Sequence, residues 1–196
     1  MWVDCEMTGL DLEHDALVEI AVIVTEADLT ELDEGISLII RPEDLSVLDG
    51  MEDVVREMHT SSGLLPLIPD GIPVAQAQEE VLAYVRRHVP EPRRAPLAGS
   101  SVYVDRAFLA RSMPELDAHL HYRLVDVSSV KEIARRWYPR AYFASPEKSG
   151  NHRALGDIRE SIAELRYYRD AIFVPQPGPD SESARATAAG HVVDHG

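Results

Sequence analysis

Two carboxylates, Asp4 and Glu6, stand one residue apart in the segment Trp2-Val-Asp-Cys-Glu-Met7. The alternation of polar and apolar residues predicts a β-strand with both carboxylates on one face. The apolar neighbours favour a central strand, where unpaired anions are costly and a divalent cation would offset that cost. An exposed strand face without a ligand has the same pattern, so this pair alone leaves both interpretations open.

Three other residues have types that could complete a metal-dependent site. Asp105 follows an expected strand and begins an expected helix, while Asp157 lies in the first turns of the last expected helix and His152 shortly precedes it. Each residue has an ordinary alternative. An acid near a helix N-terminus can cap the helix or stabilise its dipole, and an isolated loop histidine is usually not catalytic.

Taken together, four acids and one histidine supply the parts of a phosphodiester hydrolase. Magnesium and manganese prefer oxygen ligands, and two such ions about 3.5–4 Å apart suit in-line attack on a phosphodiester. An imidazole can accept the proton of the attacking water at neutral pH. Zinc fits less well, because the single cysteine, Cys5, makes a poor thiolate site.

The elements that must position these residues form an α/β pattern. Three strands are expected at Trp2–Met7, Leu17–Thr25 and Gly35–Ile40, joined by short turns into an antiparallel meander. Two further strands are expected at Ala95–Ala98 and Arg123–Val127. Helices are expected at Leu45–Met58, Val74–His88, Val104–Arg111, Val130–Trp137 (capped by Ser128 or Ser129) and about Ala154–Phe173, with a loop at Tyr138–Asn151.

Composition and charge limit the classes of function. The 196 residues suffice for one domain with a buried core, here residues 1–174, and the turn-forming segment 175–196 predicts a disordered tail. No apolar run reaches the roughly 18 residues that span a bilayer, no signal peptide is recognised, and the lone cysteine favours a reducing, cytoplasmic setting.

The net charge of −15 lies entirely in residues 1–60, which hold 17 acids and 2 bases. Proteins that coat long nucleic acids show a broad basic surface, which this chain lacks, so a ligand with few phosphates fits better. An excess of bases between Lys131 and Arg153 fits a solvated helix face as well as a binding surface.

Several sequence segments resemble the DEDDh class of 3′→5′ exonucleases, and oligoribonuclease in particular. The three motifs of the class are matched by Asp4-Cys-Glu6-Met-Thr-Gly-Leu10, Gly99-Ser-Ser-Val-Tyr-Val-Asp105 and His152-Arg-Ala-Leu-Gly-Asp157. Segments similar to oligoribonuclease itself are Met58-His-Thr-Ser-Ser-Gly-Leu64, Tyr122-Arg-Leu-Val-Asp-Val-Ser128 and Asp157-Ile-Arg-Glu-Ser-Ile162. The resemblance extends from residue 1 to about residue 174.

The resemblance implies a ribonuclease H-like fold, a homodimer, and hydrolysis of short RNA, especially 5′-phosphorylated dinucleotides, to nucleoside 5′-monophosphates. It implies that Asp4, Glu6, Asp105 and Asp157 bind two Mg²⁺ or Mn²⁺ ions and that His152 is the general base. One ion would lower the pKa of the attacking water, and the other would stabilise the leaving 3′ oxygen.

The resemblance also implies a set of substrate contacts. Leu10 would wedge against the bases, and Tyr122 would reach the site of the partner subunit. The 5′ phosphate would be capped by His59, Ser101, Arg123 and Ser128. Arg123 can pair bidentately with a phosphate, and such a cap would exclude longer chains. Leu10, Ser101 and Ser128 also fit turn or capping roles, and Tyr122 fits a core or interface role.

Three positions depart from the family pattern. Val54 stands where a base-stacking tryptophan is frequent, and such stacking contributes roughly 1–3 kcal/mol. Ser100 stands where an asparagine is frequent, and Gly156 is a poor helix former just before Asp157. None of the three removes a metal ligand or the base.

Two other functions are compatible with parts of the sequence. A proofreading or DNA-directed exonuclease of the same class would share the acids and His152 but lack the phosphate cap. A non-catalytic adaptor could use the acidic residues 1–60 as a binding surface, although a pure binder would not need the catalytic set.

Overall fold

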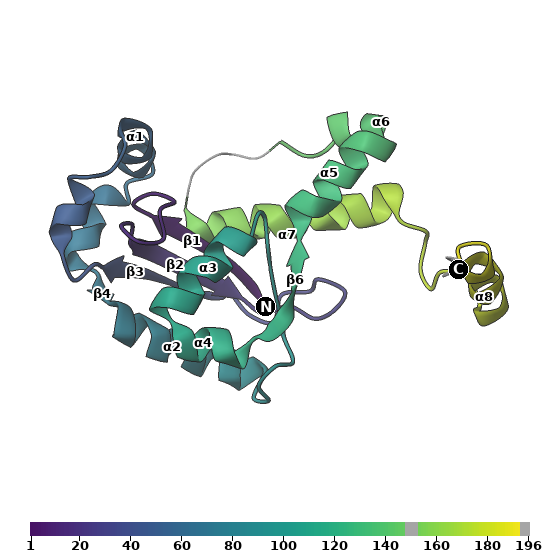
Figure 1. The fold of residues 1–196 in the computed structure, drawn as a ribbon, viewed down its shortest axis with the longest axis horizontal. Coiled ribbons are helices and arrows are strands. Elements are labelled where there is room, and N and C mark those ends of the chain that lie inside the picture. Colours follow the sequence, from purple (N-terminus) through teal and green to yellow (C-terminus); the bar gives the residue numbers. More distant parts are fainter. Residues whose placement is uncertain (148–152, 193–196) are drawn as a thin grey trace.

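The computed structural model describes residues 1–147 and 153–192. Six strands form one mixed sheet in the order β4-β3-β2-β1-β5-β6, with helices on both faces (Figure 1). The predicted α/β architecture is therefore confirmed.

The first three strands form the predicted antiparallel meander. They are β1 (Trp2–Met7), β2 (Leu17–Ile23) and β3 (Ile36–Arg41). In the register of β1 and β2, Asp4 lies opposite Ala21 and Glu6 lies opposite Glu19. Every residue of β2 is buried, which places the acidic positions of β1 beside the centre of the sheet.

The other strands run parallel to their neighbours. Strand β5 (Pro96–Gly99) pairs with β1 only at Trp2 and Ala98, and β6 (His121–Asp126) pairs with β5 and forms one edge of the sheet. The opposite edge is β4 (Ile72–Pro73). This two-residue strand was missed because it is too short to show an alternating pattern.

Helices cover the sheet on two sides. One face packs against α2 (Val74–His88), α3 (Tyr103–Ser112) and α4 (Pro114–His119) through a core that includes Val3, Val81 and Phe108. The other face packs against α7 (Ala154–Ile172) through Trp2, Ile158 and Ile162. Other helices before residue 174 are α1 (Asp53–Ser61), α5 (Val127–Trp137), α6 (Pro139–Phe143) and a 3-10 helix at Leu65–Asp70.

Three sequence expectations need correction. The predicted helix Leu45–Met58 is split into a 3-10 turn at Leu45–Leu48 and the separate helix α1. The loop expected from Tyr138 contains α6 instead, and α4 was missed. Both short helices begin with a proline at their first position, where the missing N–H costs nothing, so Pro114 and Pro139 start helices as well as ending the preceding ones.

The segment expected to be a disordered tail contains helix α8 (Ser181–Ala189), all of it exposed and set apart from the domain (Figure 1). Asp180 caps this helix by accepting hydrogen bonds from the backbone N–H groups of Glu182 and Ser183, so local capping supports the helix without a core contact. Disorder of this segment in solution stays a prediction.

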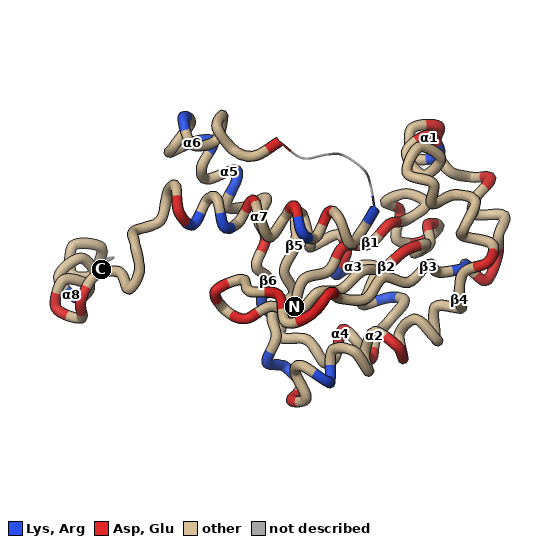
Figure 2. Tube along the Cα trace, turned by 180° about the vertical axis from the view of Figure 1, so that it is seen from behind, with Lys and Arg blue, Asp and Glu red and all other residues tan. Residues whose placement is uncertain are grey.

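Charge is distributed as the sequence suggests. Acidic residues gather around β1, β2 and α1, whereas α5 carries Lys131, Arg135 and Arg136 against one acid, Glu132, and α7 carries both signs (Figure 2). Within the described part of the chain, no helix has both the length and the apolar character needed to cross a membrane.

Gly156, in the first turn of α7, offers a test of helix stability. A Cβ atom added there would meet nothing within 4 Å. We expect Gly156→Ala to stabilise the protein by about 1 kcal/mol, because alanine loses less backbone entropy. Thermal unfolding should show a melting temperature higher by roughly 2–4 °C. Gly35→Ala is the opposite control, since Gly35 has a φ of +83° and an added Cβ would lie 2.7 Å from the Val22 carbonyl oxygen.

Candidate active site

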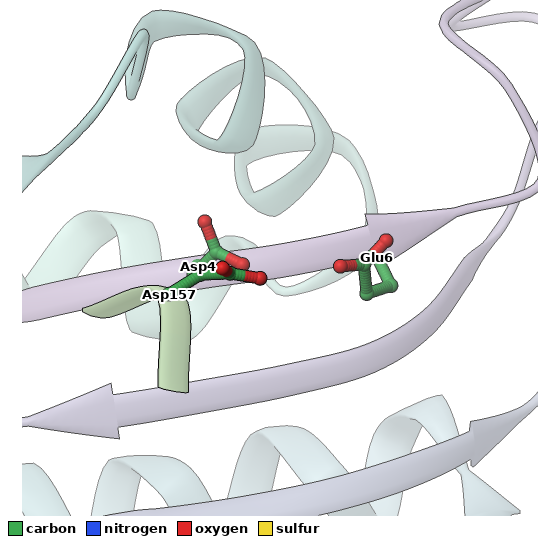
Figure 3. Close-up of side chains that lie close together, drawn as sticks. All are labelled: Asp4, Glu6 and Asp157. Carbon is green, nitrogen blue, oxygen red and sulfur yellow. The ribbon is translucent and has the colours of Figure 1, made fainter. Parts of the chain in front are cut away.

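Three of the predicted metal ligands lie together. Asp4 and Glu6 on β1 and Asp157 near the start of α7 each offer a carboxylate oxygen, and these atoms lie within 4.8 Å of one another (Figure 3). Residues about 150 positions apart in the sequence therefore share one site, and three hard oxygen donors suit a divalent cation.

The fold explains why the strand and the helix meet here. Trp2, Asp4 and Glu6 share the β1 face that α7 covers, and Trp2 packs in the same core cluster as Ala154 and Ile158 of that helix. The strand partner of Asp4 is the small residue Ala21, which leaves room for the start of α7.

Asp105, the fourth predicted ligand, comes from the first turn of α3 and is buried. Its Oδ1 atom accepts a 2.8 Å hydrogen bond from the backbone N–H of Cys5. Strand β5 pairs with β1 only at Trp2, which leaves the edge of β1 that faces away from β2 unpaired at Cys5, so Asp105 satisfies this N–H instead. Asp105 is thereby fixed between Asp4 and Glu6 along the strand, although it is not part of the three-carboxylate cluster.

The electrostatics favour a cation. Burial, followed by the charges of Asp105, Glu6 and Asp157, raises the pKa of Asp4 to about 9. Burial, followed by the charge of Glu19, raises the pKa of Glu6 to about 8. Burial also raises the pKa of Asp105 to about 7. In the metal-free protein, the raised pKa values of Asp4 and Glu6 favour their protonated forms at neutral pH, and a divalent cation would displace those protons.

The predicted general base, His152, lies outside the described residues. His59, predicted to cap a phosphate, is completely buried on α1. Its Nε2 donates to the Met7 carbonyl oxygen at 2.8 Å, and its Nδ1 lies 3.8 Å from Glu6 Oε2. His59 therefore faces the carboxylate cluster from behind Glu6.

Ser101 and Ser128 lie side by side, as their predicted common role requires. The Ser101 hydroxyl donates to the Ser128 hydroxyl at 3.1 Å. Asp126 holds the pair by accepting from both backbone N–H groups, at 3.0 and 2.9 Å. Asp126 also caps α5, in place of the expected Ser128 or Ser129, so the Ser128 hydroxyl is not used as the helix cap. The sequence signal for Asp126 was an Asp two residues before a serine at a helix start.

Tyr122 and Arg123 are at the other end of β6 from Ser128. Both are exposed, and the Arg123 guanidinium lies 5.5 Å from the centre of the Tyr122 ring. Asp126 is three residues farther along the strand, roughly 10 Å away. Within the described residues, no hydrogen bond joins Arg123 to Ser101 or Ser128, so the structure brings the two serines together but does not join Arg123 to them.

Leu10 is 74% exposed in the loop between β1 and β2, close in sequence to Glu6. Asp15 shapes this loop by accepting from the Thr8 hydroxyl at 2.7 Å and the Asp11 N–H at 2.9 Å. Arg111 of α3 fixes the same loop to that helix, because its Nη2 donates a hydrogen bond to the Asp15 carbonyl oxygen. Sequence reasoning missed Asp15 and Arg111, because their role depends on contacts formed only in the fold.

The three departures have distinct surroundings. Val54 is 68% exposed on α1, so it offers a small apolar surface where a tryptophan is frequent. The Ser100 hydroxyl lies 2.9 Å from that of Ser161 on α7, which links the end of β5 to that helix. Gly156 lies one residue before Asp157 in a regular helix, so it does not break the first turn of α7.

This chain is similar to known exonucleases and oligoribonucleases. The exonuclease family model RNase_T matches residues 1–165. The chain is 66% identical over 193 residues to the oligoribonuclease of Streptomyces avermitilis, covering 98% of this chain and 96% of that protein. It is 64% identical to the oligoribonuclease of Streptomyces coelicolor over 196 residues, covering 100% and 98%. For a Mycobacterium tuberculosis oligoribonuclease the identity is 54%, covering 96% and 88%.

Solved structures show the same fold. An exonuclease I structure aligns with a TM-score of 0.64 at 15% identity, covering 86% of this chain and 40% of that chain. The zinc-bound form of an Escherichia coli ExoI–ssDNA complex aligns with a TM-score of 0.66 at 14% identity, covering 87% and 40%. This chain thus spans about 40% of the exonuclease I chains, and the likeness shows the ribonuclease H-like fold alone.

The identity to curated oligoribonucleases extends over nearly the whole chain, and the exonuclease model covers residues 1–165, the range that contains Asp4, Glu6, Asp105 and Asp157. The chain therefore belongs to the oligoribonuclease family of metal-dependent exoribonucleases.

Proposed function

We propose that this protein degrades RNA fragments of a few nucleotides, above all 5′-phosphorylated dinucleotides, to nucleoside 5′-monophosphates by two-metal-ion hydrolysis. The observation that carries the proposal is the partly buried cluster of Asp4, Glu6 and Asp157 beside Asp105. Mg²⁺ or Mn²⁺ suits these residues, because every donor is a carboxylate oxygen.

Each residue of the site has a separate role in the proposed hydrolysis. Asp4, Glu6, Asp105 and Asp157 hold the cations and fix the scissile phosphate next to β1. Bound divalent cations supply the positive charge that the phosphate and the attacking water require. His152 retains the predicted role of general base. The backbone of β1 and the first turn of α7 keep the carboxylates in place, so little reorganisation is needed during the reaction.

The length of the substrate is set by the Ser101–Ser128 pair. Asp126 holds the backbone N–H groups of both serines at the ends of β5 and β6, and the neighbouring hydroxyls can turn to donate to a terminal phosphate. A phosphate enclosed there leaves no path for more nucleotides on its 5′ side. The acidic residues 1–60 add to this preference, since they disfavour a long polyanion.

A homodimer completes the site in this proposal. Strand β6 is an open sheet edge that continues directly into α5, and this stretch exposes Tyr122 (73%), Ile133 (42%) and Trp137 (70%). Exposed strand edges and exposed apolar patches of this kind are usually covered by another part of the chain or by a second protein chain. Because Arg123 lies over the Tyr122 ring, the subunit that contributes Tyr122 to a site contributes Arg123 as well.

The proposal is tested by a substrate-length series. We expect kcat/KM for a 5′-phosphorylated RNA dinucleotide to exceed that for a 24-mer by at least about a hundredfold, or roughly 3 kcal/mol. Activity should require Mg²⁺ or Mn²⁺ and disappear with a chelator. Comparable rates on both lengths would refute the cap as a length-determining device.

Two control arms separate the alternatives. A DNA-directed exonuclease would hydrolyse a deoxyribonucleotide series with equal or greater efficiency. A non-catalytic adaptor would bind the dinucleotide without releasing mononucleotides. Ser101→Ala should reduce the preference for the dinucleotide while a chelator still abolishes the remaining activity.

A further inference from the structure

A buried carboxylate next to the metal-binding cluster has no role in the proposed mechanism. Glu19 lies in the fully buried strand β2, directly opposite Glu6, and only 1% of it is exposed. A buried anion needs hydrogen bonds and a cation. Ser37 on β3 supplies one hydrogen bond, since its hydroxyl donates to Glu19 Oε1 at 2.9 Å.

The cation for Glu19 comes from Arg153, immediately before α7. Arg153 Nη2 lies 3.3 Å from Glu19 Oε1, and Nε lies 3.3 Å from Oε2, so the pair is bidentate across 134 positions of sequence. The carbonyl oxygen of Arg153 accepts from the N–H groups of Gly156 and Asp157, at 2.8 and 3.1 Å. Arg153 thus contacts the sheet through its side chain and the Asp157 backbone through its carbonyl.

We propose that Glu19 and Arg153 are positioning residues that fix the first turn of α7 against the sheet and thereby place the Asp157 carboxylate beside Asp4 and Glu6. This inference rests on the proposed function, in which those three carboxylates bind the cations. Glu19 itself lies outside the three-carboxylate cluster, and its two oxygens are used by Arg153 and Ser37.

The geometry explains why a tether is needed at this point. Asp157 is the fourth residue of α7, and the arginine contacts of that helix lie farther along, at Arg159, Arg166 and Arg169. A small displacement of the first turn would move the Asp157 carboxylate away from Asp4. Misplacement by about 1 Å can cost a hundredfold in rate, and loss of supporting partners typically costs 10–100-fold in metal affinity.

The test compares Glu19→Gln, Arg153→Met and the double variant with the wild type. Glu19→Gln keeps the side-chain shape, and the double variant leaves no unpaired charge, so it tests the idea even if Arg153→Met alone fails to fold. We expect Glu19→Gln and the double variant to bind Mn²⁺ about 10–100-fold more weakly and to be similarly impaired in kcat. KM for the dinucleotide should change little.

Hydrogen exchange of the metal-free protein gives a second readout. The N–H groups of Gly156 and Asp157 should exchange faster in Glu19→Gln and in the double variant. In both, the Arg153 carbonyl that accepts from these groups is no longer fixed by the ion pair with Glu19. Glu31→Gln is the matched control. Glu31 and Arg159 form another 3.3 Å ion pair between α7 and a distant part of the chain, with no contact to the cluster. Glu31→Gln should leave Mn²⁺ affinity and the hydrogen exchange of the N–H groups of residues 156 and 157 unchanged.

Two results would overturn the inference. In the first, the folded Glu19→Gln and double variants bind Mn²⁺ and exchange the N–H hydrogens of residues 156 and 157 as the wild type does. In the second, Glu31→Gln changes Mn²⁺ affinity and hydrogen exchange as much as Glu19→Gln does. Failure of the proposed function looks different. In that case the wild type would not hydrolyse the dinucleotide, while hydrogen exchange would still report whether the tether holds α7.

Discussion

Replacing Asp4 with asparagine should abolish catalysis and stabilise the metal-free protein at the same time. Asp4 lies in the carboxylate cluster and is a proposed ligand, so we expect kcat/KM on a dinucleotide to fall at least about a thousandfold, or roughly 4 kcal/mol. The opposite effect on stability follows from its pKa, which burial and the neighbouring acids raise to about 9. When the wild type unfolds, Asp4 ionises in water, and this ionisation lowers the free energy of unfolding. Asparagine cannot ionise, so the substitution removes this stabilisation of the unfolded state.

The sign of the pH dependence follows from the same shift. Between the ordinary pKa near 3.8 and the folded value near 9, the native protein binds more protons than the unfolded chain. Stability of the metal-free wild type should therefore fall as pH rises through this window, and Glu6 adds to the trend up to about pH 8. Asp4→Asn should flatten the curve. Melting temperatures measured from pH 5 to 9 in chelator would show both effects.

Divalent cations should reverse this trend. Cation binding displaces protons from the cluster, so the increase in melting temperature caused by Mn²⁺ should grow with pH in the wild type. Glu57→Gln on α1 is the matched control, because it removes one exposed acid from the same acidic region. A similar stability gain and activity loss in Glu57→Gln would show that net charge, not the cluster, is responsible.

The parts of the fold that the sequence predicted well are those with a strong local pattern. The alternation in Trp2–Met7 placed Asp4 and Glu6 on one face, and the structure puts that face against α7. The meander followed from runs of Val and Ile between turns. Short elements were missed, because two or six residues, as in β4 and α4, carry too few positions to show a period.

The supporting residues of the site could not be predicted in this way. Glu19, Asp126 and Asp15 each act through partners at other positions in the chain or through loop geometry, and nothing in their neighbouring residues shows those contacts. Asp105 was predicted to be a metal ligand, but its hydrogen bond to the Cys5 N–H depends on β5 ending early. Side-chain type and spacing thus identify candidate ligands, whereas the residues that orient them emerge only from tertiary packing.

The proposed role of Tyr122 across a dimer predicts that activity depends on how two mutations are distributed between subunits. Asp105→Ala removes a proposed ligand and Tyr122→Ala removes the exposed ring at the start of β6. Each homodimer should be nearly inactive. A heterodimer of one subunit of each kind should regain about half the wild-type rate, because one of its two symmetric sites has an intact Asp105 and a Tyr122 from the partner.

The matched arrangement places both substitutions in one subunit and pairs it with a wild-type subunit. If Tyr122 acts across the interface, this heterodimer should be nearly inactive. The site with an intact Asp105 then receives alanine in place of Tyr122 from the partner subunit, and the other site lacks Asp105. If Tyr122 acts within its own subunit, the two arrangements exchange their activities. Heterodimers isolated with two different affinity tags allow the comparison. Equal activity in both arrangements would exclude a shared site and leave Tyr122 as a structural residue of the β6 edge.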